Sequence, residues 1–386
     1  MRIFVNAVSL RTAGGLSVGL NFLQAFGESS FDHELHAFVP GDCGYERIRD
    51  ERIKIHVVPR KYDIGPLKFA LVSRWLLRQI RDVVPDVVFS MGNIALPTRV
   101  PQLLLLQWAY AIYPESPVWR RMGWRSYLER RARLHMFRTR LRFATAVAVQ
   151  TETARMRMRR LYGERWVEVV PNAVTLPALG GSDRLDVVPH DPAARWTLLC
   201  LTRYYPHKNL EILLPVARML KERAAGVRVL LTLAADQHPG ARRLLREIDR
   251  QGIGDVLVNI GPVPMASIPS LYAQVDGLLL PTLLESFSGT YVEAMHFGVP
   301  IFTSDRDFAR DVCGDAAVYF DPESPESICE SVTSALSNGA LVESLKARGR
   351  ARVAGFPDWA QVCGMYVSLL ERIGSGSRTA TEGRLP

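Results

Sequence analysis

The sequence has 386 residues, of which 48% are hydrophobic, and this length favours two folded domains over one. No apolar run reaches the ~18 residues that a membrane-spanning helix needs. The five cysteines show no paired spacing, so we expect neither a disulfide framework nor a zinc site. The net charge of +9 fits three kinds of partner, namely nucleic acid, an anionic membrane surface or a phosphorylated substrate, or no specific partner at all.

The first half alternates short apolar runs with amphipathic stretches. The residues at 2–10 are typical of a first strand and lack the long apolar region and cleavage site of a signal peptide. The spacing of apolar residues predicts helices over 16–26 and 66–84. Further strands are predicted within 33–40, 54–59, 86–91, 101–108, 145–150 and 167–171. This alternation predicts a doubly wound parallel sheet.

Two features of this half could serve binding. Gly14 and Gly15 follow the first strand, where paired glycines allow a ligand to approach the backbone closely, although a simple turn explains them equally well. The segment Arg120–Arg142 holds nine arginines and one acid, Glu129, with aromatic residues interleaved. Such a helix could lie on an anionic membrane surface. A solvated helix packed by its apolar side is the alternative.

The region 175–195 is rich in proline and glycine, which is typical of a linker. A second strand–helix series follows it, with strands predicted within 196–203, 227–234, 256–261, 277–283, 299–304 and 316–321. We therefore predict an N-terminal Rossmann-like domain over 1–174 and a C-terminal domain over 196–358. A helix at about 359–373 is expected to pack back on the first domain, and 374–386 to be a disordered tail.

The strand within 277–283 leads directly into the most informative segment. Glu285 lies in the loop after this strand, and Glu293 lies in the first turns of the following helix. Ser286, Ser288 and Gly289 lie where the free N–H groups of a helix N-terminus would gather, a position that favours a phosphate. Two carboxylates there could accept hydrogen bonds from sugar hydroxyls. Taken singly, each acid also fits an ordinary helix surface.

A second loop adds positive charge on the same side of the predicted sheet. Arg203 and Lys208 follow the strand within 196–203 and precede a helix. Arginine can bind phosphate with two parallel hydrogen bonds, and lysine adds a point charge. The pair could neutralise a diphosphate, while an exposed basic loop is the alternative.

Together these segments resemble a known family. Glu285 and Glu293 form an E-x7-E arrangement, and Arg203 and Lys208 are similar to the basic pair upstream of it. The segments 170–174, 271–281 and 314–322 look like the family's interdomain crossing, the strand before the motif and a later strand. The sequence thus resembles retaining GT-B glycosyltransferase family 4, the glycosyl transferases group 1, most strongly from about 169 to 322.

The resemblance implies a GT-B fold, with two Rossmann-like domains facing a central cleft. It implies that Glu285, with the backbone of Phe287, Ser288 and Gly289, contacts the donor sugar, and that Glu293 binds the nucleotide ribose. Arg203 and Lys208 would hold the diphosphate. No divalent metal or other cofactor would be needed for the chemistry. The family usually has Glu-Gly-Phe-Gly where this chain has Glu285-Ser286-Phe287-Ser288, which puts the donor fit in question.

These implications give a functional hypothesis. The protein would be a cytoplasmic hexosyltransferase, peripheral at the inner face of the membrane, in bacterial surface polysaccharide synthesis of the O-antigen or capsule type. Its partners would be a nucleotide-sugar donor and a glycan or polyprenyl-linked glycan acceptor, but no nucleic acid. The alternatives are another GT-B nucleotide-sugar enzyme, such as an epimerase or a phosphorylase, or a basic module that binds nucleic acid or membrane. Asp305-Arg306-Asp307 reads as a DxD metal motif, but a carboxylate pair alone is a weak ligand set.

Overall fold

A computed structural model describes residues 1–62, 68–175, 188–189 and 191–376. The chain divides into two compact units. Unit 1 comprises 1–113, 124–173 and 357 onwards, and unit 2 comprises 114–123 and 174–356. The division differs from the predicted one at 114–123, a segment that belongs to unit 2 although its neighbours in the chain belong to unit 1. Most of the predicted linker and tail lies outside the described residues.

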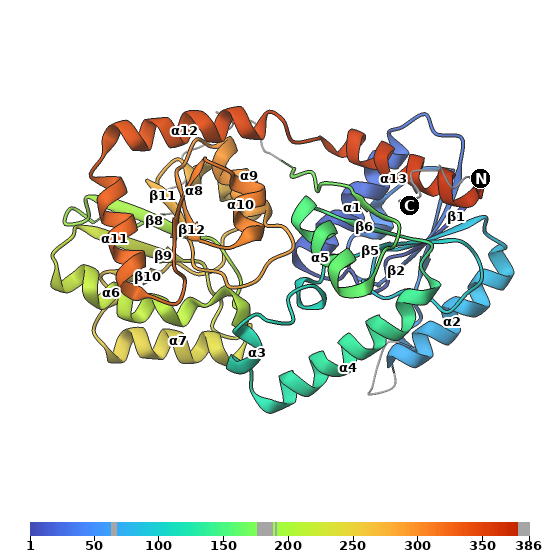
Figure 1. The fold of residues 1–386 in the computed structure, drawn as a ribbon, viewed down its shortest axis with the longest axis horizontal. Helices are drawn as coiled ribbons and strands as arrows, with labels where there is room; N and C mark the ends of the chain where they lie inside the picture. The colour runs from blue at the N-terminus through green and yellow to red at the C-terminus, as the bar shows by residue number, and fades with distance from the viewer. Residues whose placement is uncertain (63–67, 176–187, 190, 377–386) are drawn as a thin grey trace, which may run out of the picture. The chain divides into compact units, whose positions relative to one another are not determined.

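Unit 1 is built on a parallel sheet of seven strands in the order β3-β2-β1-β4-β5-β6-β7. Its core lies on both faces of this sheet. Helices α1 (Ala13–Gly27) and α13 (Trp359–Gly374) pack together on one face, and α2 (Lys68–Val83) covers the other (Figure 1). The strands are β1 (Arg2–Asn6), β2 (Glu34–Val39), β3 (Ile53–Val57), β4 (Val87–Ser90), β5 (Gln102–Leu105), β6 (Ala146–Val149) and β7 (Val167–Val169).

Unit 2 repeats this plan with six parallel strands in the order β10-β9-β8-β11-β12-β13. Helices α6 (Leu213–Glu222) and α7 (Pro239–Arg250) cover one face of the sheet (Figure 1). Helices α9 (Gly289–His296) and α12 (Gly339–Val353) pack together on the other. The strands are β8 (Trp196–Cys200), β9 (Val227–Leu231), β10 (Leu257–Asn259), β11 (Gly277–Leu280), β12 (Ile301–Ser304) and β13 (Ala317–Phe320).

Each unit holds further helices. Unit 1 also holds α4 (Trp124–Arg140) and α5 (Glu152–Tyr162), and unit 2 also holds α3 (Val118–Arg121), α8 (Ile268–Tyr272), α10 (Asp307–Cys313) and α11 (Pro325–Leu336). Every predicted strand is present, with its ends within a few residues of the prediction, which confirms the two Rossmann-like doubly wound sheets. Among the described residues, no helix is both long and apolar enough to cross a membrane.

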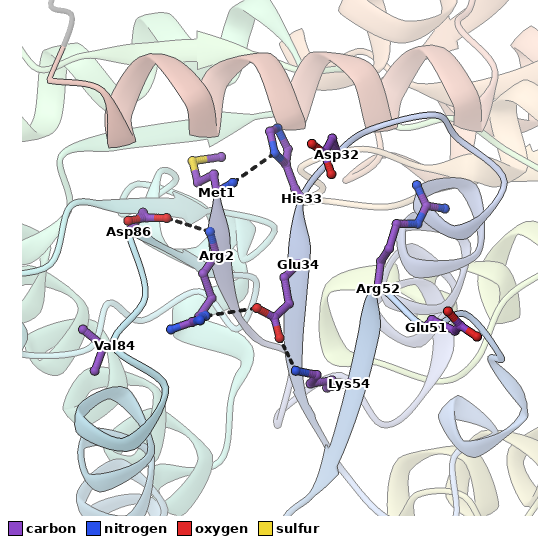
Figure 2. A pocket seen from close by; sticks show the side chains of 10 residues that line it. All are labelled: Met1, Arg2, Asp32, His33, Glu34, Glu51, Arg52, Lys54, Val84 and Asp86. Carbon is purple, nitrogen blue, oxygen red and sulfur yellow. Dashed lines mark hydrogen bonds and ion pairs between the residues drawn. The ribbon is translucent and has the colours of Figure 1, made fainter.

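The amino ends of the unit 1 strands carry a cluster of paired charges around a hollow of about 610 Å³. Glu34 accepts hydrogen bonds from Lys54 and Arg2, and the bond from Lys54 is the main reason that the pKa of Glu34 falls to about 2 (Figure 2). Because Glu34 is already paired with Arg2 and Lys54, and because ligands of such sheets bind at the opposite, carboxyl edge, we assign no ligand to this hollow.

Two histidines beside this cluster predict how stability depends on pH. His36 Nδ1 lies 3.1 Å from His56 Nε2, and burial lowers the pKa of both imidazoles below 6.5. The unfolded chain therefore binds more protons than the folded chain as pH falls below about 6.5, so the stabilisation present above that pH is lost. Glu34 contributes nothing in this range, since its carboxylate gains protons only below its unfolded pKa of 4.5.

We expect the thermal midpoint to fall between pH 7.5 and 5.5, and to fall less in a His56→Gln variant. His135→Gln is the matched control, because His135 is exposed on α4. Thermal unfolding of the three proteins at both pH values checks this. An equal loss of midpoint in all three would show that the histidine pair does not control the acid sensitivity.

Candidate functional site

The candidate site lies at the point where the strand order of the unit 2 sheet reverses. The central neighbours β8 and β11 are parallel, and the chain leaves them in opposite directions, β8 toward β9 and β11 toward β12. In sheets of this kind ligands bind outside the carboxyl ends of the strands at this reversal. Arg203 and Lys208 follow β8, and Glu285 follows β11. The sheet topology therefore brings together the two loops that were singled out from the sequence.

Lys208 and Glu285 form a direct ion pair between these loops. Their side chains are only 14% and 13% exposed, so water screens the pair weakly. Lys208 ends the short 3-10 helix η5 (Pro206–Lys208), and the backbone fixes this helix against the other loop. The Leu283 N–H donates to the His207 carbonyl oxygen at 2.8 Å, and the Thr282 hydroxyl donates to the same oxygen at 3.1 Å.

Two further sources of positive potential belong to the same loops. Arg203 is exposed, and no hydrogen bond or ion pair of its guanidinium is found within the described part of the chain. Ser288 is the N-cap of α9, and its hydroxyl makes no capping bond. The first N–H groups of α9, from Gly289 onwards, therefore have no partner from the cap side chain. A site with these groups is suited to an anion such as a phosphate.

Phe287 lies between Glu285 and α9, and its ring meets that of Phe356 edge-on with the centroids 6.3 Å apart. Ser286 is half-buried beside it. A Cβ added at Gly289 would lie 3.5 Å from Val174, which is ordinary van der Waals contact. The space at Gly289 therefore does not demand glycine.

Glu293 lies one turn into α9 and is held from α8. The hydroxyl of the buried Tyr272 lies 3.3 Å from Glu293 Oε2, and the Tyr272 ring stacks on Phe297 with the centroids 4.9 Å apart. Burial raises the pKa of the Glu293 carboxyl, which the hydrogen bond from Tyr272 partly offsets. The contact with Tyr272 thus orients the Glu293 carboxylate through Oε2.

We expect Glu293→Ala to raise the KM for the donor about 10- to 100-fold, with a much smaller change in kcat, because it removes one charged hydrogen-bond acceptor. Tyr272→Phe should shift the donor KM in the same direction by less, since it only loosens the carboxylate. Initial rates over a range of donor concentrations measure both variants. A fall in kcat at unchanged donor KM would contradict a ribose-binding role for Glu293.

Sequence reasoning missed Asn209, the residue after Lys208. Its backbone is left-handed (φ 57°, ψ 35°), a conformation that asparagine tolerates well. Its buried Nδ2 donates to the carbonyl oxygens of Pro281 at 3.1 Å and Pro322 at 2.7 Å. Asn209 thus ties the loop that carries Lys208 to the segment that leads to Glu285. Its position beside Lys208 and its turn-forming side chain were the only signals in the sequence.

Gly14 and Gly15 lie in the first turn of α1, after β1. A Cβ at Gly14 would meet nothing within 4 Å, and one at Gly15 would meet only the Leu10 side chain at 3.3 Å. They belong to unit 1, so their part in donor binding stays a prediction. No cluster of three or more His, Cys, Asp or Glu that could hold a metal ion is found in the part of the chain that the structure describes. Asp305, from the DxD sequence, pairs with Arg310.

The arginine-rich segment divides into parts with different surroundings. Arg120 and Arg121 belong to α3, whereas most of the others lie on α4. Arg130 and Arg133 stack on the rings of Tyr110 and Trp108, at 5.0 and 4.6 Å from the ring centroids. Leu134 and Phe137 on the same helix are buried, as the packed-helix alternative predicts. The first turns of α4 instead expose Trp124, Tyr127 and Leu128, together with Arg125 and Arg131.

Comparison with known proteins shows that part of the chain is similar in sequence to glycosyltransferases. Residues 186–352 match the family described as Glycosyl transferases group 1. The chain is 32% identical over 97 residues to O-antigen chain mannosyltransferase B of Escherichia coli. It is 30% identical over 218 residues to phosphatidyl-myo-inositol mannosyltransferase of Mycobacterium tuberculosis. These matches cover 25% and 54% of this chain, and they span 26% and 55% of the two relatives.

Solved structures share the fold over nearly the whole chain. Sucrose-phosphate synthase from Thermosynechococcus elongatus aligns with a TM-score of 0.75 at 14% identity, covering 98% of this chain and 100% of that one. WaaG, a glycosyltransferase involved in lipopolysaccharide biosynthesis, aligns with a TM-score of 0.69 at 14% identity, covering 96% and 99%. The fold is therefore GT-B. The match to the glycosyl transferases group 1 family spans residues 186–352, and this stretch contains the Lys208–Glu285 site.

Proposed function

We propose that the protein is a retaining glycosyltransferase of family 4, which moves a sugar from a nucleotide-diphosphate sugar to a glycan or lipid-linked acceptor. The observation that carries the proposal is the Lys208–Glu285 ion pair at the reversal of the unit 2 sheet, beside the N-terminus of α9. An exposed Arg203 and a half-buried Glu293 supply the two further contacts that such a donor needs.

In the proposed sugar transfer, negative charge develops on the departing diphosphate, and the residues of the site would stabilise it. The bond between the anomeric carbon and the diphosphate oxygen breaks, the acceptor oxygen forms a new bond to that carbon, and its proton passes to the departing diphosphate or to water. The departing nucleoside diphosphate gains negative charge, which Arg203, Lys208 and the N–H groups of α9 would stabilise. Glu285 would hold the sugar, and Glu293 the ribose. We propose that no metal ion is required, because these groups supply the positive potential.

A mannose donor is the first to test, since both curated relatives are named as mannosyltransferases. We propose a surface glycan acceptor of the O-antigen type for the same reason. The decisive experiment incubates the protein with a nucleotide-diphosphate mannose, with and without a polyprenyl-linked glycan, and identifies the products. Transfer that depends on the acceptor, with the α-anomer retained, supports the proposal. Conversion of the donor sugar without an acceptor would favour an epimerase, and phosphate-dependent cleavage of a glycan a phosphorylase.

We also propose a cytoplasmic location, with peripheral attachment to the inner face of the membrane through the first turns of α4. Trp124, Tyr127 and Leu128 are 68%, 39% and 56% exposed. Residues 124, 127, 128 and 131 share one face of the helix by their spacing. An exposed aromatic face beside arginines suits an anionic lipid surface better than free solution. A nucleic-acid partner would leave the Lys208–Glu285 site unexplained.

The membrane proposal predicts that replacing Arg125 and Arg131 by glutamate reduces sedimentation with anionic vesicles about tenfold or more. Each juxtamembrane arginine contributes about 1 kcal/mol at such a surface, and glutamate also adds repulsion. Arg130 is left unchanged because it stacks on Tyr110. Arg242→Glu with Arg246→Glu on α7 makes the same change of charge in the other unit and serves as the control. Equal binding by all three proteins would exclude this surface.

A further inference from the structure

Segment 114–123 is an exception to the order of the two units along the chain. Residues 113 and 124 on either side of it belong to unit 1, yet the segment itself belongs to unit 2. Its helix α3 contacts η5, which carries Lys208. Val118 and Trp119 of α3 are buried, and Ser116 caps the turn by accepting from the Val118 N–H at 3.5 Å. The segment is thus packed in place beside the candidate site.

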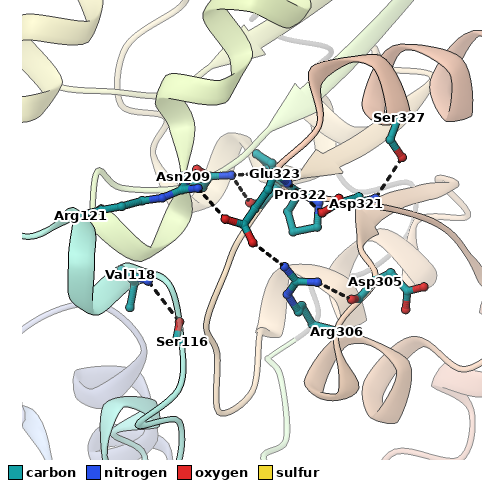
Figure 3. Close-up of polar contacts among 11 residues, drawn as sticks. Ser116, Val118, Arg121, Asn209, Asp305, Arg306, Asp321, Pro322, Glu323 and Ser327 are labelled. Carbon is teal, nitrogen blue, oxygen red and sulfur yellow. Dashed lines mark hydrogen bonds and ion pairs between the residues drawn. The ribbon is translucent and has the colours of Figure 1, made fainter.

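Arg121, at the end of α3, is the polar centre of this packing. Its Nη1 donates to Asn209 Oδ1 at 2.5 Å, and its Nη2 donates to Glu323 Oε1 at 2.9 Å. The second oxygen of Glu323 accepts from Arg306 at 3.3 Å. Figure 3 shows Arg121 reaching from α3 toward Asn209 and Glu323, with Arg306 approaching Glu323 from the other side.

The contact to Asn209 matters because the Asn209 side chain is buried and its amide nitrogen already makes two hydrogen bonds. The residue is 4% exposed, and its Nδ2 donates to the carbonyl oxygens of Pro281 and Pro322. Arg121 supplies the donor to the remaining amide oxygen. Without it a buried acceptor would lose its partner, and the amide would be free to rotate away from Pro281 and Pro322. Asn209 follows Lys208 directly, and Pro281 begins the segment that ends at Glu285.

We propose that Arg121 is a positioning residue that holds Lys208 and Glu285 in register through Asn209. The inference rests on the proposed transferase function for its kinetic consequence, but not for its structural one. It also assigns a role to segment 114–123: a part of the chain bounded by unit 1 on both sides takes part in forming the donor site of unit 2. Completion of the donor site is then coupled to the docking of that segment.

Hydrogen–deuterium exchange of the full-length protein without ligand tests the structural claim. Arg121→Ala should exchange faster than wild type at 206–212 and 281–288, and Arg121→Lys should lie between them, because lysine can keep one of the two contacts. Arg120→Ala is the matched control, since Arg120 is the exposed neighbour on the same helix. Unchanged exchange at both sites in Arg121→Ala would overturn the proposal, whatever the activity.

Kinetics test the functional claim. Arg121→Ala should lower kcat about 10- to 100-fold, as a displaced catalytic group does, with the acceptor KM nearly unchanged. In a Lys208→Ala background the same change should add a clearly smaller loss, because the part of the effect that acts through Lys208 is already gone. A full additional loss in that background would overturn the route through Lys208. A wild-type protein that transfers no sugar would refute the proposed function, while faster exchange in Arg121→Ala would still support the positioning role.

Discussion

Replacing Glu285 by alanine is expected to lower kcat for sugar transfer about 100- to 1,000-fold, the largest loss among the single acids of the site. The carboxylate would hold the donor sugar and is the counter-ion of Lys208, so its removal disturbs the sugar and the cation that meets the leaving phosphate together. Affinity for the free nucleotide should change much less than kcat, since Glu285 is assigned to the sugar and acts on the diphosphate only through Lys208. Steady-state rates and calorimetric titration with the nucleoside diphosphate separate the two quantities.

Glu330→Ala is the control for this experiment, because Glu330 is exposed on α11 in the same unit. It should behave as wild type. If Glu285→Ala also retained a kcat near that of wild type, Glu285 would have no catalytic part and the site would have to be placed elsewhere.

Replacing Lys208 by alanine should lower kcat by a similar factor of about 100 to 1,000, because the cation would stabilise the charge that grows on the departing diphosphate. The double variant Lys208→Ala/Glu285→Ala should lose much less than the product of the two single losses. Each single change already leaves a mostly buried charge without its partner, so the second change removes a repelled or unpaired group. The rates of the four proteins form a complete double-mutant cycle.

Lys221→Ala provides the comparison for Lys208. Lys221 pairs with Asp255 on the surface of unit 2 and is 46% exposed, so its ion pair contributes little. Adding EDTA to the wild-type assay separates lysine from metal as the source of positive charge. A mild effect of Lys208→Ala together with loss of activity in EDTA would contradict the metal-free mechanism.

The fold could be predicted because each strand is a short apolar run between helical patterns. Parallel strands that are buried on both faces appear in the sequence as such runs, whichever strands they pair with. The division into units was less predictable. Segment 114–123 lies between stretches of unit 1, and the contact of α3 with η5 and the hydrogen bonds of Arg121 to Asn209 and Glu323 join it to unit 2. A hydrophobic pattern gives the face of a helix, but not the domain against which that face packs.

The candidate site could likewise be predicted from the sequence only in part. Lys208 and Glu285 were found because each lies in a loop that follows a predicted strand, a property that the sequence shows directly. Their direct pairing was not foreseen, nor was the support of Glu293 by Tyr272. Arg121 lies 88 residues from Asn209 in the sequence, and no local pattern joins them. Contacts that depend on side-chain direction across such separations require the three-dimensional structure.

The most direct test of the central claim is a thermal-shift screen of the purified protein against UDP, GDP, TDP and their sugars, run beside Lys208→Ala. The account predicts that one nucleotide family raises the midpoint of the wild-type protein, and that Lys208→Ala reduces this rise, because ligand that binds only the folded state stabilises it. No shift with any nucleotide, or an equal shift in both proteins, would contradict a donor diphosphate at the Lys208–Glu285 site.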